Sequence, residues 1–206
     1  MDPTVAEFHR KYYNSDVWKT MKWLGHPLLK CPLDLWIYQE IITELRPGLI
    51  IETGTYEGGS AMFMASICDL LGHGHVVTID PTPSVTPEHP RITYLRGSSV
   101  DPTILAQVQQ MVDHTDGPVV AILDAEHSKA YVVHELTHYS KFVTLGSYLI
   151  CEDTNVNGRP VAVGFGPGPG EAVDEFLSVR PDYVRDPHRE RLMMTFNPGG
   201  YLKRVS

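Results

Sequence analysis

Acidic residues close two apolar segments that have the composition of buried strands. Asp124 ends PVVAILD (118–124), and Glu152 and Asp153 end SYLICED (147–153). If these strands are neighbours in a sheet, they lie roughly 4.8 Å apart and their terminal carboxylates converge. Three unpaired carboxylates would repel one another, and a divalent cation removes that conflict. All-oxygen ligands favour Mg²⁺, Mn²⁺ or Ca²⁺ over Zn²⁺, and a partly hydrated Mg²⁺ fits a site that must also take substrate. The pattern therefore predicts a Mg²⁺ site, with helix capping and solvent exposure of the acids as the alternative.

A histidine follows the first of these acids at the start of the next helical segment. His127 lies three residues after Asp124, and an unperturbed imidazole titrates at a pKa of about 6.5, close to working pH. It can therefore accept a proton from a substrate hydroxyl. The chain has ten histidines, so only its location makes His127 the candidate general base.

A glycine-rich turn joins another apolar run to a helical pattern in IETGTYEGGSAMFMA (51–65). Glu52 ends the run, Gly54 and Gly58 allow close approach of the backbone to a ligand, and a helix begins near Ser60. The spacing E-x-G-x-x-x-G-G differs from the dinucleotide fingerprint G-x-G-x-x-G. An acid at this place disfavours a pyrophosphate and suits a cationic ligand such as S-adenosylmethionine. The alternative is a turn that only packs, with Glu52 as a cap.

Three more residues extend this candidate cofactor site. Asp80 ends HVVTID, where a carboxylate can accept both hydroxyls of a ribose, although a turn aspartate before Pro81 is the commoner case. Ser98 and Ser99 follow the next strand pattern and are candidates for contact with the adenine end.

Strand and helix patterns alternate along the chain and must position these side chains. The strand patterns are 49–54, 75–80, 92–97, 118–124 and 147–153, and the helical patterns are 37–46, 59–71, 102–113, 128–145 and 171–180. This alternation predicts an α/β fold with a mostly parallel sheet and helices on both faces. The tail RLMMTFNPGGYLKRV predicts two strands around a Pro-Gly-Gly turn, which would add an antiparallel hairpin at the sheet edge.

The first 36 residues lie outside this alternation and are expected to form an extension that packs on the core. They are rich in aromatic residues, which favours self-association into a homo-oligomer. Trp18 and Trp23 are expected in the core or an interface, with a wall of the substrate site as the alternative. The long loop 156–172 follows the second acidic strand and is expected to close over substrate.

Length and charge bound the remaining possibilities. The chain has 206 residues, which fits one domain, and a formal net charge of −8, which disfavours nucleic acid and anionic membranes as partners. No apolar run is long enough to cross a bilayer, and the polar N-terminus shows no secretion signal. With three separated cysteines, this predicts a cytoplasmic protein with reduced thiols.

Several segments together resemble the cephalosporin hydroxylase / rhamnosyl O-methyltransferase family. They are NSDVWKTMKWLGHPLLKCPLDLWIYQEII, IETGTYEGGSAMFMA, LDAEHSKAYVVHEL, YLICEDT and GPGPGEAVDEFL. The resemblance implies a Rossmann-like class I methyltransferase with a seven-stranded sheet in residues 37–206, and it implies S-adenosylmethionine and Mg²⁺ as cofactors. It implies Asp124, Glu152 and Asp153 as metal ligands. Related catechol O-methyltransferase-like enzymes place a lysine base where this chain has His127, so the role of His127 is not inherited.

The expected function is methylation of a hydroxyl on a small molecule, either a sugar or another natural product such as an antibiotic. The residues expected at the cofactor are Glu52, Gly54, Thr55, Tyr56, Gly58, Ser60, Asp80, Ser98, Ser99 and Asp124. Two alternatives stay open from the sequence. One is a cofactor-binding accessory protein without catalysis, and the other is a nicotinamide-dependent oxidoreductase on a similar sheet.

Overall fold

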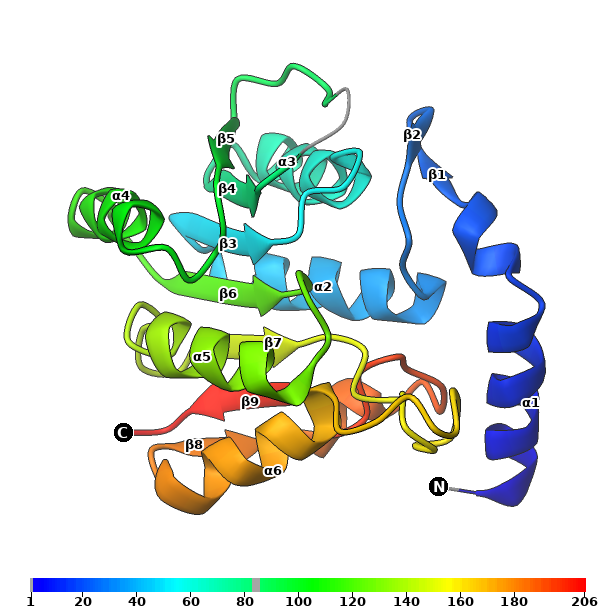
Figure 1. The fold of residues 1–206 in the computed structure, drawn as a ribbon. Helices are drawn as coiled ribbons and strands as arrows, with labels where there is room; N and C mark the ends of the chain where they lie inside the picture. Colours follow the sequence, from blue (N-terminus) through cyan, green and yellow to red (C-terminus); the bar gives the residue numbers. More distant parts are fainter. Residues whose placement is uncertain (1, 83–85) are drawn as a thin grey trace.

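A seven-stranded sheet runs through the molecule, and helices cover both of its faces (Figure 1). The computed structural model describes residues 2–82 and 86–206. The strand order is β5-β4-β3-β6-β7-β9-β8, in which the first five are parallel and β9 pairs antiparallel with both neighbours. This confirms the predicted fold class.

The elements alternate in the expected order. The strands are β3 (Leu49–Thr53), β4 (His75–Asp80), β5 (Ile92–Arg96), β6 (Val119–Leu123), β7 (Tyr148–Cys151), β8 (Tyr183–Arg185) and β9 (Tyr201–Arg204). The helices of the core are α2 (Pro32–Leu45), α3 (Gly59–Leu71), α4 (Pro102–Asp113), α5 (Lys129–Tyr139) and α6 (Pro169–Val179).

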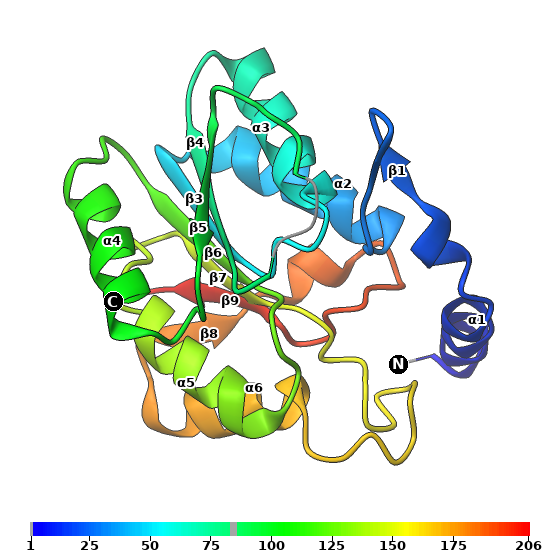
Figure 2. The same ribbon diagram turned by 45° about the horizontal axis from the view of Figure 1, so that its top comes forward.

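Two hydrophobic cores lie on the two faces of the sheet, because successive side chains of a strand point to opposite faces. In β3, Leu49 and Ile51 pack with α4, α5 and α6, whereas Ile50 packs with α2 and α3. Figure 2 shows the same division, with α2 and α3 on one side of the sheet and α4, α5 and α6 on the other. Burial on both faces explains why the strands read as continuous apolar runs.

Of the two strands predicted for the C-terminal hairpin, only the second forms. The antiparallel partner of β9 is β8, reached through a 3-10 helix, η2 (Pro187–Glu190), while residues 191–197 form no strand. The backbone there hydrogen-bonds elsewhere, since the Phe196 N–H donates to the carboxylate of buried Asp34 at 2.8 Å. Two helix ends differ by five or more residues: α2 begins at Pro32 rather than at residue 37, and α5 ends at Tyr139 rather than at residue 145.

An N-terminal segment covers one end of the sheet. It comprises α1 (Pro3–Asn14), a 3-10 helix η1 (Val17–Thr20) and a hairpin of β1 (Lys22–Trp23) and β2 (His26–Pro27). The buried His9 of α1 stacks on Phe196 at a centroid distance of 5.5 Å and accepts a hydrogen bond from Asn155 Nδ2 at 3.0 Å. Among the described helices, none is long and apolar enough to span a membrane.

Candidate active site

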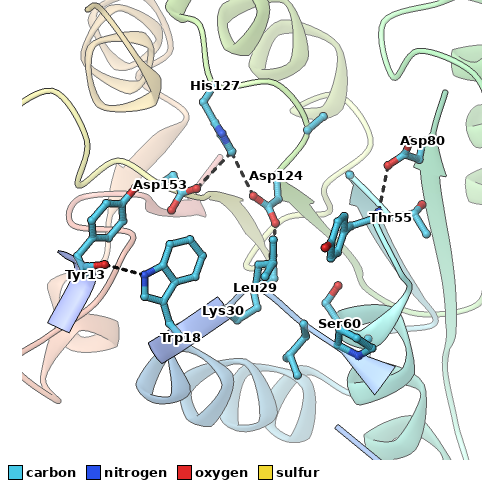
Figure 3. A pocket seen from close by; sticks show the side chains of 16 residues that line it. Tyr13, Trp18, Leu29, Lys30, Thr55, Ser60, Asp80, Asp124, His127 and Asp153 are labelled. Carbon is cyan, nitrogen blue, oxygen red and sulfur yellow. Dashed lines mark hydrogen bonds and ion pairs between the residues drawn. The ribbon is translucent and has the colours of Figure 1, made fainter. Parts of the chain in front are cut away.

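A cavity of about 380 Å³ opens at the carboxyl ends of the central strands (Figure 3). One side is formed by the turn after β3, with Thr55, Tyr56 and Ser60, and by Asp80 at the end of β4. The strand tips and the N-terminal segment complete the wall. Ligands of open parallel sheets bind at this edge, so the cavity is where the topology predicts a site.

Two of the predicted acids and the histidine meet at the middle of this cavity. His127 Nε2 lies 3.2 Å from Asp124 Oδ1 and 3.3 Å from Asp153 Oδ2. The three ligand atoms lie within 4.8 Å of one another, a grouping that could hold a metal ion. Their proximity follows from the parallel pairing of β6 with β7, where Leu123 is opposite Cys151.

Asp153 reaches the cavity through an uncommon backbone conformation. Its φ is 53°, in the left-handed region, and its N–H donates to Asn197 Oδ1 at 3.0 Å. The same Asn197 donates through Nδ2 to the Tyr38 hydroxyl at 3.1 Å. Asn197 therefore ties the turn after β7 to α2, and it is a positioning residue that the sequence did not reveal.

A buried lysine lies between Asp124 and the third predicted acid, Glu152. Lys30, whose side chain is 3% exposed, contacts Asp124 Oδ2 and lies 2.5 Å from Glu152 Oε1. Tyr38 donates a second hydrogen bond to Glu152 Oε1 at 2.8 Å. Glu152 does not belong to the group of possible metal ligands formed by Asp124, His127 and Asp153. We call Asp124, Glu152 and Asp153 the acidic cluster.

The sequence interpretation missed Lys30. The only signal in the sequence is that Lys30 is the one lysine or arginine in the apolar stretch HPLLKCPL. A lysine buried with such a stretch needs a carboxylate partner. A buried lysine is stable only when it is paired, and Lys30 has two carboxylate partners. The acidic cluster and Lys30 together carry a formal charge of −2.

Burial and charge shift every pKa in the cluster. Burial raises the pKa of Asp153 to about 6 and that of Glu152 well above its usual range. Burial also opposes ionisation of Asp124, but the Lys30 ammonium and a hydrogen bond from His127 lower its pKa. Burial would lower the pKa of His127, yet the surrounding carboxylates outweigh it and raise the pKa to about 9.

The turn after β3 approaches its neighbours closely. A Cβ at Gly54 would lie 1.9 Å from the Asp124 carbonyl oxygen, and one at Gly59 would lie 2.1 Å from the Pro27 carbonyl oxygen. These glycines therefore permit packing of the turn against β6 and the N-terminal segment. Asp80 Oδ2 accepts a hydrogen bond from Tyr56 N at 3.0 Å and stays at the cavity rim.

Glu52 lies beneath this turn and is fully buried. Its Oε2 accepts a hydrogen bond from Thr78 at 2.7 Å, and its Oε1 has no hydrogen-bond partner within residues 2–82 and 86–206. Burial raises its pKa despite the charge of Lys30. Glu52 and Gly58 are not among the residues that line the cavity, so any action of theirs on a cofactor passes through the turn.

The predicted adenine contacts lie elsewhere. The hydroxyls of Ser98 and Ser99 lie 2.8 and 2.9 Å from that of Tyr131, and Ser99 also donates to Glu135 at 2.6 Å. Neither serine lines the cavity. The structure thus does not bring them to the other site residues, because their hydroxyls bridge to α5.

The matching family model, described as Rhamnosyl O-methyltransferase/CmcI, covers residues 15–205. A rhamnosyl O-methyltransferase of Mycobacterium tuberculosis (strain CDC 1551 / Oshkosh) is 38% identical over 210 residues, covering 98% of this chain and 86% of the relative. That of Mycobacterium leprae (strain TN) is 37% identical over 213 residues, covering 98% and 91%.

A solved CmcI structure, described as a Mg-SAM form, has a TM-score of 0.71 at 24% identity. It matches 91% of this chain and 78% of its own. At that identity the likeness supports the fold alone. Family membership is instead shown by the match of the family model and by the similarity to the rhamnosyl O-methyltransferases. The chain therefore belongs to the family of O-methyltransferases described as Rhamnosyl O-methyltransferase/CmcI, as its motifs predicted.

Proposed function

We propose that this protein transfers a methyl group from S-adenosylmethionine to a hydroxyl of a sugar, with Mg²⁺ as cofactor. The observation that carries the proposal is the meeting of Asp124, His127 and Asp153 at the cavity wall. The names of the relatives favour a rhamnosyl acceptor, and the description of the CmcI structure favours the ion and the donor.

The residues of the acidic cluster fit a hard divalent cation. With all three acids ionised, the cluster and Lys30 carry a formal charge of −2, which a protonated His127 reduces to −1, and a divalent cation would offset the negative charge that remains. Asp124 and Asp153 would hold the cation. Glu152 lies outside the group that could hold an ion, and its Oε1 is bound by Lys30 and Tyr38, so its role as the third ligand stays a prediction from the sequence. When bound, such an ion lowers the pKa of a hydroxyl next to it.

His127 is the proton acceptor in this proposal. Its Nε2 faces the acids at the centre of the cavity, where a substrate hydroxyl must lie to reach them. The carboxylates alone raise its pKa to about 9 and would keep it protonated. Once their charge is offset, its pKa falls towards the ordinary value and Nε2 can take the hydroxyl proton. Positioned bases contribute about 10²–10⁴-fold to a rate.

The methyl donor belongs on the side of the turn after β3. Asp80 at the rim can accept ribose hydroxyls, as the acid in this position does in related sheets. The buried carboxyl group of Glu52 beneath the turn suits a cationic rather than an anionic ligand above it. Aligning the donor methyl with the acceptor oxygen is then the main contribution of the site.

The wider setting remains part of the proposal. We infer a small natural product as acceptor, with antibiotic biosynthesis as one context, and a cytoplasmic homo-oligomer, and each of these rests on the sequence. Closure of the loop 156–172 over substrate likewise remains a prediction.

Methyl transfer to methyl α-L-rhamnopyranoside, measured with and without EDTA, tests the function. Asp124→Asn should lower turnover at least about 100-fold, while Asp113→Asn, an exposed acid on α4, should leave it unchanged. Full turnover of Asp124→Asn in EDTA would reject the metal role. Donor binding without transfer to any acceptor would favour the accessory protein, and NAD in the purified protein would revive the oxidoreductase.

A further inference from the structure

Two aromatic side chains of the N-terminal segment line the cavity on the side away from the turn after β3, where we place the methyl donor. Tyr13 is in the last turn of α1 and Trp18 is in η1. Figure 3 shows them beside Asp153, whereas Thr55 and Asp80 lie across the cavity beyond Asp124. The acidic cluster therefore separates an aromatic side from a donor side.

These two rings hold each other in place. Trp18 Nε1 donates to the Tyr13 carbonyl oxygen at 3.0 Å, and their rings stack with centroids 5.4 Å apart. The ring of Phe196 makes a T-shaped contact with each of them, at a centroid distance of 5.5 Å in both cases. Aromatic surface that is already fixed loses little conformational entropy when a ligand packs on it.

The anchor of the rings belongs to the core of the protein. The N–H of Phe196 donates to Asp34, which lies in the first turn of α2 and is buried. Asp34 also accepts a hydrogen bond from the Tyr201 hydroxyl of β9 at 2.8 Å. The aromatic side is thus connected through Phe196 to both α2 and the sheet.

The chemistry of the two sides matches one class of acceptor. A pyranose has a face of C–H groups, which carry slight positive charge and pack against the negative face of an aromatic ring. Its hydroxyls project from the rim and can reach carboxylates. Tyr13 and Trp18 offer aromatic surface next to Asp153. A single pyranose can therefore pack its C–H face on the aromatic rings while its hydroxyls reach the carboxylate.

We propose that Tyr13 and Trp18 form the acceptor subsite, which binds the C–H face of a pyranose and turns its vicinal hydroxyls towards the acidic cluster. This inference rests on the proposed function and gives its acceptor a binding surface. It also gives the N-terminal segment a role in specificity, since both rings come from outside the parallel sheet.

Binding in the presence of S-adenosylhomocysteine and Mg²⁺ tests the subsite without turnover. Saturation-transfer NMR and calorimetry would follow methyl α-L-rhamnopyranoside with the wild type, Trp18→Leu, Trp18→Phe and Trp36→Leu. Trp36 is an exposed tryptophan of α2, 60% accessible, and serves as the matched control. Trp18→Leu should weaken sugar binding at least tenfold, whereas Trp18→Phe and Trp36→Leu should stay within about threefold of the wild type.

Binding of S-adenosylhomocysteine is the separate measure of the donor site and should be the same in all four proteins. Sugar binding by Trp18→Leu at wild-type strength would overturn the subsite, and so would a wild type that binds a catechol but no pyranoside. In both cases retained methyl transfer would leave the methyltransferase function standing. A wild type that binds no S-adenosylhomocysteine would instead reject the proposed function.

Discussion

Replacing Lys30 by methionine should destabilise the protein strongly and in a pH-dependent way. The substitution keeps the length of the buried side chain and removes the ammonium that contacts Asp124 and Glu152. Both acids lie within the protein, and their side chains are 19% and 5% exposed. Breaking a buried pair by removing one partner costs about 3–5 kcal/mol, because the remaining charge loses its compensation.

The size of the effect can be expressed as a melting temperature. For a chain of this length, 1 kcal/mol corresponds to a shift of roughly 2–4 °C, so the variant should melt about 6–20 °C lower near pH 8. The control is Lys129→Met. Lys129 forms an ion pair with Glu175 at 2.7 Å, but the two side chains are 37% and 52% exposed. Such a pair contributes about 0–1 kcal/mol.

The pH dependence follows from the pKa shifts. The two carboxylates raise the pKa of Lys30 above its ordinary value despite its burial, so its contribution is complete below the unfolded pKa and disappears only at strongly alkaline pH. Between pH 8 and pH 5 Lys30 itself therefore stays protonated in the wild type. Without Lys30, the folded-state pKa of Asp124 should rise from its lowered value, and that of Glu152, already raised by burial, should rise further. Their protonation then restores stability to the variant as the pH falls.

Chemical and thermal unfolding in EDTA at pH 8 and pH 5 provides the measurement, and added Mg²⁺ should recover part of the loss at pH 8. Equal losses for Lys30→Met and Lys129→Met would show that Lys30 does not compensate the charge of the acidic cluster. A loss of stability in Lys30→Met that is the same at both pH values would show that the charges of Asp124 and Glu152 do not cause it.

Three further predictions concern the surroundings of the site. Asp34→Ala should lower the free energy of unfolding by about 2–4 kcal/mol, measured by urea unfolding, because it leaves the Phe196 N–H unpaired in a buried position. Gly54→Ala should fold poorly, visible as a lower melting temperature, since its Cβ would lie 1.9 Å from the Asp124 carbonyl oxygen. The imidazole of His127, followed by NMR without metal, should titrate near pH 9, and saturating Mg²⁺ should lower that value; a titration near 6.5 without metal would contradict the role of the acids.

Much of the fold could be predicted because its determinants are local. The helices 59–71 and 102–113 and the strand 75–80 have the bounds that their patterns predict. A strand buried on both faces and a helix with one apolar face leave their periods in consecutive residues. The main exception was residues 191–197, which form no strand although their composition is strand-like, and in which the Phe196 N–H donates to Asp34, 162 residues away.

The site was predictable in part for the same reason. Asp80, Asp124 and Asp153 follow strands of a parallel sheet, and the carboxyl ends of such strands share one edge, so strand order alone brings these acids to one cavity. Ser98 and Ser99 follow a strand as well, but their hydroxyls meet Tyr131, and no periodicity reports where a short side chain finds its partner.

The sequence by itself determined the parallel sheet, the family and the acids at the strand tips, because each of these depends on a pattern of consecutive residues. Only the tertiary structure decided that Lys30 pairs with two of those acids, which lie 94 and 122 residues away in the chain, and that Tyr13 and Trp18 line the same cavity. A buried cation and a half-buried aromatic ring acquire their roles from whatever surface packs against them, and that surface comes from distant parts of the chain.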